Sequence, residues 1–453
     1  MARVTVTQWN VGCVNLNPFG VRVGWPGLDG LLERATEALR SPAAPRIGDV
    51  AFSSDMLAEL TDHCRSLELP VTDKAVADME AALQEPLGWV LSRELTDKRL
   101  ISLPDRHTSQ VAPGLYRPAM TTPATADQLP TNRWAWWKHW LEFMFEDRGA
   151  AVPAPAQLVP VTPEKYGAMR ERATSQYRQL ACLAIFDAVM RFVIMRADPE
   201  WSAVRLELLN RFVHGLDDRI AEQLKRLDAG GTDVFCLEEV SPQLARQLGT
   251  EVALPGFHVV FPAAGKQLPV VALRKAVFPA IDHLRHDVRL LTIKATTQEG
   301  FRVLLGAFHA DSSGKDTVAT IEEVIGRHEE CGADFCAIGA DCNTTVLPGV
   351  RKLKLDRLVN LLQEEGKEWR LAPPADDLSR GWTACDSKTV LQPQGGKAAK
   401  AVRLDQRDFV ITNAKMVECH VVRGGGDDDP EVLPTTKWPS DHAAVTAVLS
   451  FRS

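Results

Sequence analysis

The chain has 453 residues, of which 45% are hydrophobic and 25% charged, with 52 Lys and Arg against 59 Asp and Glu. This ordinary balance excludes a disordered chain, a collagen-like chain and a small disulfide scaffold. The net charge of −7 argues against a uniformly basic surface for nucleic acid and against a polybasic membrane anchor. A local basic groove remains compatible with that net charge, because a sum does not locate its charges.

Cysteine usage and hydropathy point to a protein of the cell interior. The nine Cys form no CxxC pair, which is typical of reduced cysteine. The first residues begin directly with a strand pattern and show no secretory signal. The most apolar stretch, Leu180–Met195, contains Asp187 and Arg191 and falls short of the ~20 residues of a membrane span. We therefore expect a cytoplasmic protein without a membrane span, and a nuclear location is also compatible.

The first half of the chain is expected to hold one strand followed by helices. Alternating side chains over residues 4–9 predict a strand that ends at Asn10. From 21 to 225 the spacing of apolar residues and the capping signals predict mostly helices. These are Leu28–Leu39, Ser54–Leu67, Asp73–Leu83, a helix capped by Asn132, one from Pro163 to Arg196, and one from Pro199 to Leu227.

The second half changes to short apolar runs, each of which ends in small polar residues. These runs predict buried strands at Asp233–Val240, Phe301–Ser313, Ala333–Thr344, Arg407–Thr412 and Pro439–Phe451. Helices are predicted between them at Thr317–His328 and Arg351–Glu365. The predicted organisation is a first strand in 1–20, a helical insertion in 21–225, and the remainder of the strand-containing core in 226–453.

Eight polar side chains lie at or just beyond the predicted strand ends. They are Asn10, Glu239, His309, Asp341, Asn343, Asp408, Asp441 and His442. Carboxylate and amide oxygens suit a hard divalent cation such as Mg²⁺, and histidines transfer protons near neutral pH. No Cys/His spacing suits zinc, and neither a dinucleotide-binding fingerprint nor a Walker A loop is present.

The short motifs around these residues, taken in order, resemble those of the endonuclease/exonuclease/phosphatase superfamily, which has the deoxyribonuclease I-like fold. Gln8-Trp9-Asn10 resembles its first-strand Asn motif, and Cys236–Val240 resembles "LQEV" with Glu239 at the metal-binding Glu. The later motifs resemble "NxH", "GDFN", "DYI" and the closing "SDH" at Ala307–His309, Gly339–Asn343, Arg407–Val410 and Ser440–His442. The resemblance covers about residues 1–20 and 230–453.

Three positions depart from these motifs. Glu238 replaces the Gln of "LQEV" and adds a carboxylate, and Ala307 replaces the Asn of "NxH". Ala340 stands between Gly339 and Asp341. None of the changes removes a carboxylate or a histidine, and the two-residue spacing of Asp341 and Asn343 predicts that both lie on one face of a strand.

The resemblance implies an α/β fold, a four-layer α/β/β/α sandwich, here with a large α-helical insertion after the first strand. It also implies that Glu239 holds Mg²⁺, with Asn10 and Asp441 nearby and Mn²⁺ as a substitute. A cation at this place would neutralise the charge that develops on a phosphate during hydrolysis.

The remaining site residues receive catalytic roles from the same resemblance. Asp341 or His442 would take the proton from the attacking water, and Asp408 would fix the tautomer of His442. Asn343 would hydrogen-bond the nucleophile or the phosphate, and His309 would donate to a phosphate oxygen or to the leaving group.

The expected activity is Mg²⁺-dependent phosphoester hydrolysis by a nuclease acting on DNA or RNA. All three Tyr lie between 116 and 177, so the active-site Tyr of the apurinic endonuclease branch has no counterpart between the Glu and Asp motifs. A phosphatase of inositol phosphates or of another small phosphoester is the first alternative. The second is a catalytically weak scaffold whose helical insertion binds a protein partner.

Three further features have a functional and a plainer interpretation. Trp134, Trp136, Trp137 and Trp140 follow helical spacing, which favours core packing over stacking on bases. The basic stretch Lys388–Arg403 fits a phosphate-contacting loop or a flexible loop equally well. The acidic, glycine-rich residues 424–429 are typical of a linker.

Overall fold

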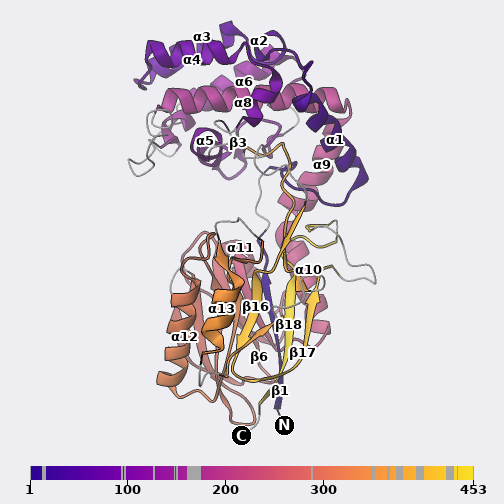
Figure 1. The fold of residues 1–453 in the computed structure, drawn as a ribbon, viewed down its shortest axis with the longest axis vertical. Coiled ribbons are helices and arrows are strands. Elements are labelled where there is room, and N and C mark those ends of the chain that lie inside the picture. Colours follow the sequence, from indigo (N-terminus) through magenta and orange to yellow (C-terminus); the bar gives the residue numbers. More distant parts are fainter. Residues whose placement is uncertain are drawn as a thin grey trace. The chain divides into compact units, whose positions relative to one another are not determined.

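The structure is a computed structural model that divides the chain into two compact units (Figure 1). The sandwich unit comprises Met1–Cys13, Gly215–Ser387 and Val402–Ser453, and the helical unit comprises Val14–His214 and Lys388–Ala401. The structure describes residues 2–12, 17–92, 95, 98–125, 128–146, 148, 152–160, 175–286, 289–347, 352–364, 368–373, 381–393, 402–424, 433–435 and 437–451.

Two six-stranded mixed sheets form the centre of the sandwich unit. The strands of the first sheet, in spatial order, are β17 (Lys415–Val422), β18 (Ala444–Phe451), β1 (Ala2–Asn10), β4 (Val234–Val240), β6 (Leu268–Arg274) and β5 (Phe257–Val260). Those of the second are β13 (Arg370–Ala372), β16 (Asp408–Thr412), β10 (Phe335–Asp341), β9 (Arg302–His309), β8 (Leu290–Thr296) and β7 (Ala280–His286). Short pairs flank them: β11 (Thr344–Thr345) with β12 (Leu353–Lys354), and β14 (Ala384–Asp386) with β15 (Arg403–Asp405).

Three hydrophobic clusters show that the two sheets and their helices form four layers. One cluster lies between the sheets and includes Val6 of β1 and Val410 of β16. A second packs α10 (Leu216–Ala229) and α11 (Pro242–Leu248) against the outer face of the first sheet. A third packs α12 (Thr317–Cys331) and α13 (Leu355–Leu362) against the outer face of the second. The predicted four-layer α/β/β/α sandwich is therefore confirmed.

The first strand lies in the middle of its sheet. In Figure 1 the indigo β1 runs beside the yellow β18, although the two are at opposite ends of the sequence. β1 pairs antiparallel with β18 through Val6↔Ala447, and parallel with β4 through Asn10↔Glu238. The core of the sandwich unit is thus assembled from segments that are separated by more than 200 residues.

Gly339 of β10 allows the two sheets to approach each other. A Cβ atom at this position would lie 2.3 Å from the Cβ of Cys236 and 2.9 Å from the Cβ of Gln8, both on the facing sheet. The glycine of the "GDFN"-like motif therefore has a packing role that is independent of any chemistry.

The helical unit is built mainly around α8, which is buried along most of its length. Its α-helices are α1 (Pro26–Arg40), α2 (Ile47–Val50), α3 (Ser54–Ser66), α4 (Asp73–Ala82), α5 (Leu103–Thr108), α6 (Arg133–Phe145), α8 (Gln176–Ala197) and α9 (Trp201–Leu209). It also holds 3-10 turns at Leu87–Leu91 and Pro155–Leu158, π-turns at Lys98–Ser102 and Asn210–His214, and the hairpin β2 (Gln110–Ala112) with β3 (Leu115–Tyr116). No helix within the described ranges is both long enough and apolar enough to cross a membrane.

The tryptophans of α6 belong to the core of the helical unit, as their spacing predicts. Trp136, Trp137 and Trp140 are buried, and the indole Nε1 of Trp140 donates to Asp187 Oδ2 at 2.9 Å. The same carboxylate accepts from Nε of the buried Arg117 at 2.7 Å. The charge inside the apolar run of α8 is therefore paired rather than exposed, as buried charges require.

The boundaries of the units differ from the predicted ones at 20/21 and 225/226. The helix predicted from Pro199 to Leu227 is interrupted at Asn210–Gly215, so the continuous helix is wrong. Leu208 before the break packs in the helical unit, whereas Leu216 after it packs in the sandwich. Of the described residues after Ser387, 388–393 join the helical unit, where Leu391 is buried.

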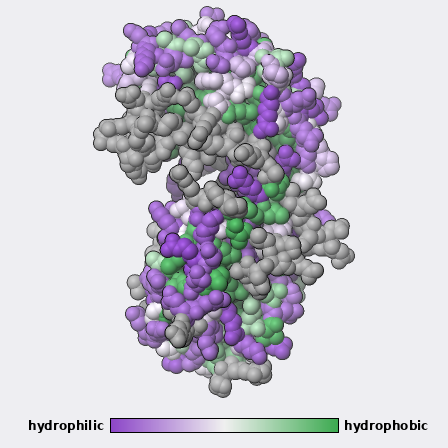
Figure 2. Space-filling model, in the orientation of Figure 1, coloured by the Kyte–Doolittle hydropathy of each residue, from purple (hydrophilic) through white to green (hydrophobic). Residues whose placement is uncertain are grey.

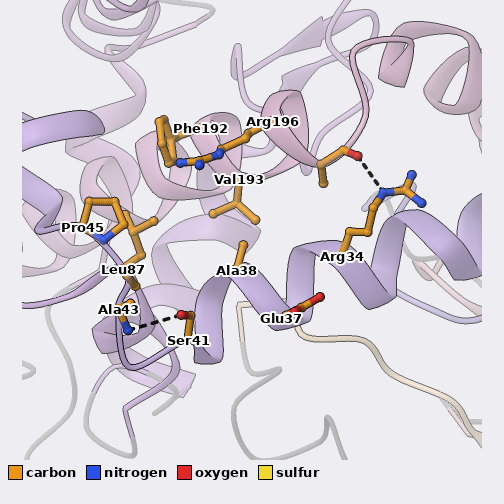
Figure 3. A pocket seen from close by; sticks show the side chains of 12 residues that line it. Arg34, Glu37, Ala38, Ser41, Ala43, Pro45, Leu87, Phe192, Val193 and Arg196 are labelled. Atoms are coloured by element: carbon orange, nitrogen blue, oxygen red, sulfur yellow. Dashed lines mark hydrogen bonds between the residues drawn. The ribbon is translucent and has the colours of Figure 1, made fainter.

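A cavity of about 440 Å³ lies in the helical unit between α1 and α8 (Figure 3). Its walls are apolar at Ala38, Leu87 and Val193, and none of the predicted site residues lines it. The visible face of the molecule in Figure 2 is mainly hydrophilic, with smaller hydrophobic areas between, which agrees with the apolar side chains being gathered in the cores.

We predict that Gly339→Ala destabilises the sandwich unit, because its methyl group would overlap with Cys236 across the two sheets. Overpacking of this kind costs about 1–3 kcal/mol. Gly326→Ala, in α12, is the matched control: nothing lies within 4 Å of its added Cβ, and alanine favours a helix by up to about 1 kcal/mol. Chemical denaturation measures both, and equal stabilities of the two variants would contradict the prediction.

Candidate active site

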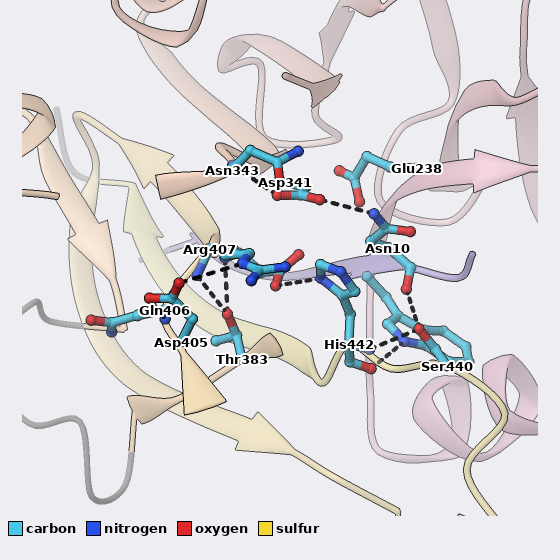
Figure 4. A network of polar contacts seen from close by, with 12 residues as sticks. Asn10, Glu238, Asp341, Asn343, Thr383, Asp405, Gln406, Arg407, Ser440 and His442 are labelled. Atoms are coloured by element: carbon cyan, nitrogen blue, oxygen red, sulfur yellow. Dashed lines mark hydrogen bonds and ion pairs between the residues drawn. The ribbon is translucent and has the colours of Figure 1, made fainter. Parts of the chain in front are cut away.

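The predicted site residues meet at one edge of the two facing sheets. The parallel pair β1 and β4 ends there with Asn10 opposite Glu238, and the parallel pair β9 and β10 ends with His309 opposite Asp341. The antiparallel strand β16 begins at the same edge, with Asp408 opposite Asp341. The strand pairing therefore gathers residues from five strands at one place. Figure 4 shows the contact between Asn10 and Asp341, which belong to different sheets.

Asn10 joins the first sheet to the acids of the second. Its Nδ2 donates to Asp341 Oδ2 at 3.0 Å and to Glu239 Oε1 at 3.4 Å. Its Oδ1 accepts the backbone N–H of Gly12 at 2.9 Å, and its backbone carbonyl accepts Ser440 Oγ at 2.7 Å. The amide of Asn10 is thus fixed with its N–H groups toward the carboxylates.

Glu239 reaches the edge because the backbone of β4 bulges there. Its φ of 56° is left-handed, and the β4–β6 register shifts between Leu237 and Val240. A Cβ at Gly12 would lie 2.3 Å from Glu239 Oε2, so only glycine leaves room for this side chain in its present position. Glu239 Oε1 lies 3.4 Å from Nε2 of His309, and Gln267 Nε2 donates to Glu239 Oε2.

Asp408 and His442 form a buried pair. Nδ1 of His442 lies 2.8 Å from Asp408 Oδ2, and the two side chains are 8% and 0% exposed. The carbonyl of His442 accepts the indole N–H groups of Trp9 and Trp438, and its N–H donates to Ser440 Oγ. These contacts hold the imidazole so that Nε2 is the nitrogen left for chemistry when Nδ1 serves Asp408.

The electrostatics of this edge are dominated by buried acids. Burial, with the charges of Asp408 and Asp341, raises the pKa of Glu238 well above its ordinary value. Burial opposes ionisation of Asp341 as well, but His442, His309 and the N–H of Asn343 lower its pKa overall. Burial alone would lower the pKa of His442, yet Asp408 and Asp341 raise it to about 10.

Asn343 does not share a strand face with Asp341, so that prediction is wrong. β10 ends at Asp341, and Asn343 lies beyond it with a left-handed φ of 47°, a conformation that asparagine tolerates. Its N–H donates to Asp341 Oδ1 at 2.8 Å, and its Nδ2 donates to the carbonyl of Ala310 at 3.2 Å. The turn thus orients both side chains by local hydrogen bonds.

Asp441 is joined to the site through its backbone and its charge. Its carbonyl accepts the N–H of Cys385 at 2.9 Å, and its carboxylate contributes to the raised pKa of His442. Asp441 therefore lies near the histidine side of the cluster.

One group of side chains in the described ranges could hold a metal ion. Asp341, Asp408 and His442 each offer a ligand atom, and these atoms lie within 4.8 Å of one another. All three residues belong to the set for which the sequence predicts catalytic rather than metal-binding roles.

Sequence reasoning missed several residues that shape this edge. Gln8 donates to two buried acids, Gln267 contacts Glu239, and Lys352 Nζ donates to Asn343 Oδ1 at 2.7 Å. Glu238, which replaces the Gln of the "LQEV" motif, was the sequence signal that its partner on β1, Gln8, also differs. Lys352 carried no signal, since only folding brings it to Asn343. Half of the basic stretch 388–403, from 394 to 401, and residues 425–429 of the acidic loop lie outside the described residues.

We predict that Asp408→Asn lowers the pKa of His442 in metal-free protein, because the variant removes the carboxylate that binds Nδ1. NMR titration of the labelled histidines checks this, with the exposed His420 as an internal control. Since the folded pKa is raised, this histidine stabilises the fold fully below about pH 6.5, and that contribution is lost as pH rises through about 10. An unchanged titration of His442 in the variant would contradict the prediction.

Comparison with known proteins gives one family match and several similar structures. A model described as a domain of unknown function, DUF8234, matches residues 46–206, which lie in the helical unit. No curated protein matches the sequence.

The similar solved structures include TDP2 from D. rerio complexed with single-strand DNA product, at 14% identity, 53% of this chain, 94% of that chain and a TM-score of 0.39. An endonuclease/exonuclease/phosphatase family protein from Bacteroides thetaiotaomicron gives 14% identity, 52% and 90% coverage, and a TM-score of 0.39. A mannosyl-6-phosphatase from the same organism is 15% identical, covers 52% of this chain and 91% of its own, and has a TM-score of 0.35.

Proposed function

We propose that the sandwich unit hydrolyses phosphoester bonds with the help of a divalent cation, and that its substrate is a nucleic-acid phosphodiester. The observation that carries this proposal is the buried Asp408–His442 pair, 2.8 Å apart, with a carboxylate oxygen of Asp341 within 4.8 Å of ligand atoms of both residues. A proton-transferring histidine next to oxygen ligands is what metal-assisted attack of water on a phosphate requires.

The donor set fits a hard cation. Glu238, Asp341 and Asp408 are buried acids within one network, and like charges at this spacing are costly without a compensating charge. Oxygen ligands of this kind favour Mg²⁺, with Mn²⁺ as a substitute, over zinc. When bound, the cation would supply Lewis-acid stabilisation of the phosphate oxygens.

Glu239, with Asn10 and Asp441, remains our proposed ligand set. The amide of Asn10 presents N–H groups to the carboxylates, so ligation through its oxygen requires a rotation of that amide. Isothermal titration with Mn²⁺ tests the assignment: Glu239→Gln should weaken binding more than Asp408→Asn, and the reverse order would favour the alternative cluster of Asp341, Asp408 and His442.

Two residues share the proposed work of moving the proton of the attacking water. Asp341 is held ionised by its surroundings and is therefore able to accept a proton. His442 holds a proton near neutrality in the metal-free site, and a cation nearby would lower its pKa and restore its basicity. Asp408 binds Nδ1 of His442, so Nε2 is the nitrogen that would accept the proton.

His309 and Asn343 are the proposed contacts to the phosphate. Nε2 of His309 lies 3.4 Å from Glu239 Oε1 and 3.6 Å from Asp341 Oδ2, so it stands between the two acids with its side chain 27% exposed. In this position it is able to donate to a phosphate oxygen or to the leaving group. The amide of Asn343, bound by Ala310 and Lys352, is already oriented for such a contact.

We predict hydrolysis of a phosphodiester that depends on Mg²⁺ or Mn²⁺ and stops with EDTA. His442→Ala and Asp341→Asn should lower kcat most, by about 100-fold or more, because general acid–base groups contribute on this scale. Glu239→Gln should also lower the activity, and a high Mg²⁺ concentration should restore part of the activity that this variant loses. His420→Ala, which removes an exposed histidine from β17, is the control.

A panel of single- and double-stranded DNA, RNA, inositol phosphates and sphingomyelin identifies the substrate. Turnover of inositol phosphates alone would replace the nuclease with a small-molecule phosphatase. A folded protein that neither binds a divalent cation nor hydrolyses any of these substrates would contradict the enzymatic proposal. The remaining hypothesis would then be that the protein is a scaffold whose helical unit binds a protein partner.

We further predict that Lys352→Met raises KM for the phosphodiester by about 10-fold, because its ammonium group lies at Asn343 and adds a positive charge beside the proposed phosphate position. Lys354→Met, two residues further along the chain in β12, is the matched control, since Lys354 Nζ binds the carbonyl of Leu347 instead. Steady-state kinetics at two salt concentrations compare the variants. Equal KM values for both would contradict the role.

A further inference from the structure

The side chain of Gln8 links two buried acids at the proposed site. Its Nε2 donates to Glu238 Oε2 at 2.9 Å and to Asp408 Oδ1 at 3.0 Å. All three side chains are fully buried. An amide nitrogen carries two N–H groups, and here both are used by carboxylate oxygens.

Asp408 is consequently held at both of its oxygens. Oδ1 accepts from Gln8 and Oδ2 binds Nδ1 of His442 at 2.8 Å, while the backbone N–H of Asp408 donates to Thr383 Oγ1 at 2.9 Å. The side chain of Thr383 also hydrogen-bonds this carboxylate. Loss of the Gln8 donor would leave Oδ1 less firmly held, and the imidazole of His442 would then be less well fixed in tautomer and direction.

The position of Gln8 is fixed by the packing between the sheets. It alternates with Thr7 along β1, so Gln8 faces the second sheet, where Gly339 leaves room for its Cβ. On its other side the amide is bound by Glu238, the residue that departs from the "LQEV" motif. The departure therefore supplies the acceptor that holds Gln8 in place.

We infer that Gln8 is a positioning residue, whose amide holds Asp408 in the orientation that directs His442, with Glu238 fixing that amide from the opposite side. This inference rests on the proposed hydrolysis for its kinetic consequences, but the geometry of the Asp408–His442 pair is measurable without activity.

The experiment compares Gln8→Met with Thr7→Val in the full chain. Methionine matches the length of glutamine but donates no hydrogen bond, whereas Thr7→Val removes buried hydroxyl contacts to Thr232 and Thr446 on the opposite face of the same strand. Gln8→Met should lower kcat by about 10- to 100-fold with KM within about 2-fold, the scale for partners that orient a catalytic group. Thr7→Val should leave kcat unchanged.

A double-mutant cycle with Asp408→Asn separates positioning from stability. If Gln8 acts through Asp408, adding Gln8→Met to Asp408→Asn should cause no further loss of kcat, whereas independent effects would add. Additive losses, or an equal loss of kcat in Thr7→Val, would overturn the inference.

The second readout is the NMR signal of the Nδ1–H of His442 in metal-free protein, assigned by its loss in His442→Gln. Gln8→Met should shift or broaden this signal, and Thr7→Val should not. If the wild-type protein proves inactive, the proposed function fails while this signal still tests the positioning. An unmoved signal in Gln8→Met would overturn the inference.

If Gln8→Met does not fold, the swapped variant Gln8→Glu/Glu238→Gln takes its place. It keeps a buried acid–amide pair between positions 8 and 238 but turns a carboxylate toward Asp408 Oδ1. A merely structural role predicts activity close to wild type in this variant, and that result would overturn the inference. The positioning role predicts a loss of kcat as large as in Gln8→Met.

Discussion

The pairing of β1 between β18 and β4 is the constraint on which the rest of the sandwich unit depends. Val6 lies opposite Ala447 on one side and Val234 on the other, so a strand from the start of the chain completes a sheet made by the middle and the end. Because side chains alternate along a strand, this register turns Gln8 and Asn10 toward the facing sheet. A shift by one residue would turn both amides to the outer face and dismantle the site.

This register places amides where acids converge. Asn10 donates to Asp341, and Gln8 donates to Glu238 and Asp408. Each amide thus adds N–H groups to carboxylates that are buried side by side, where an acceptor left without a donor is costly. The remaining negative charge suits the proposed divalent cation, and the carboxylates of Asp408 and Asp341 also raise the pKa of His442.

The differences between prediction and structure have local causes. The pattern from Pro199 to Leu227 is helical throughout, but its apolar face changes partner near Gly215, so one helix becomes two that belong to different cores. The strands β6 and β8 are missing from the sequence-based prediction, because no polar site residue follows either of them. Asn343 leaves the strand because its left-handed turn is stabilised by contacts with Asp341, Ala310 and Lys352, of which Ala310 is distant in sequence.

The amino-acid sequence by itself determined the strand ends and the inventory of acids, amides and histidines, because periodicity and motif order are local properties. It also determined that the tryptophans of α6 pack inward, since helical spacing places them on a shared side. Only the tertiary structure decided which of these groups touch: that Gln8 meets Asp408, that Gly12 makes room for Glu239, and that Lys352 reaches Asn343. The first two contacts depend on strand register and sheet separation, which arise from packing between segments hundreds of residues apart, whereas the third depends on the turn that follows β10.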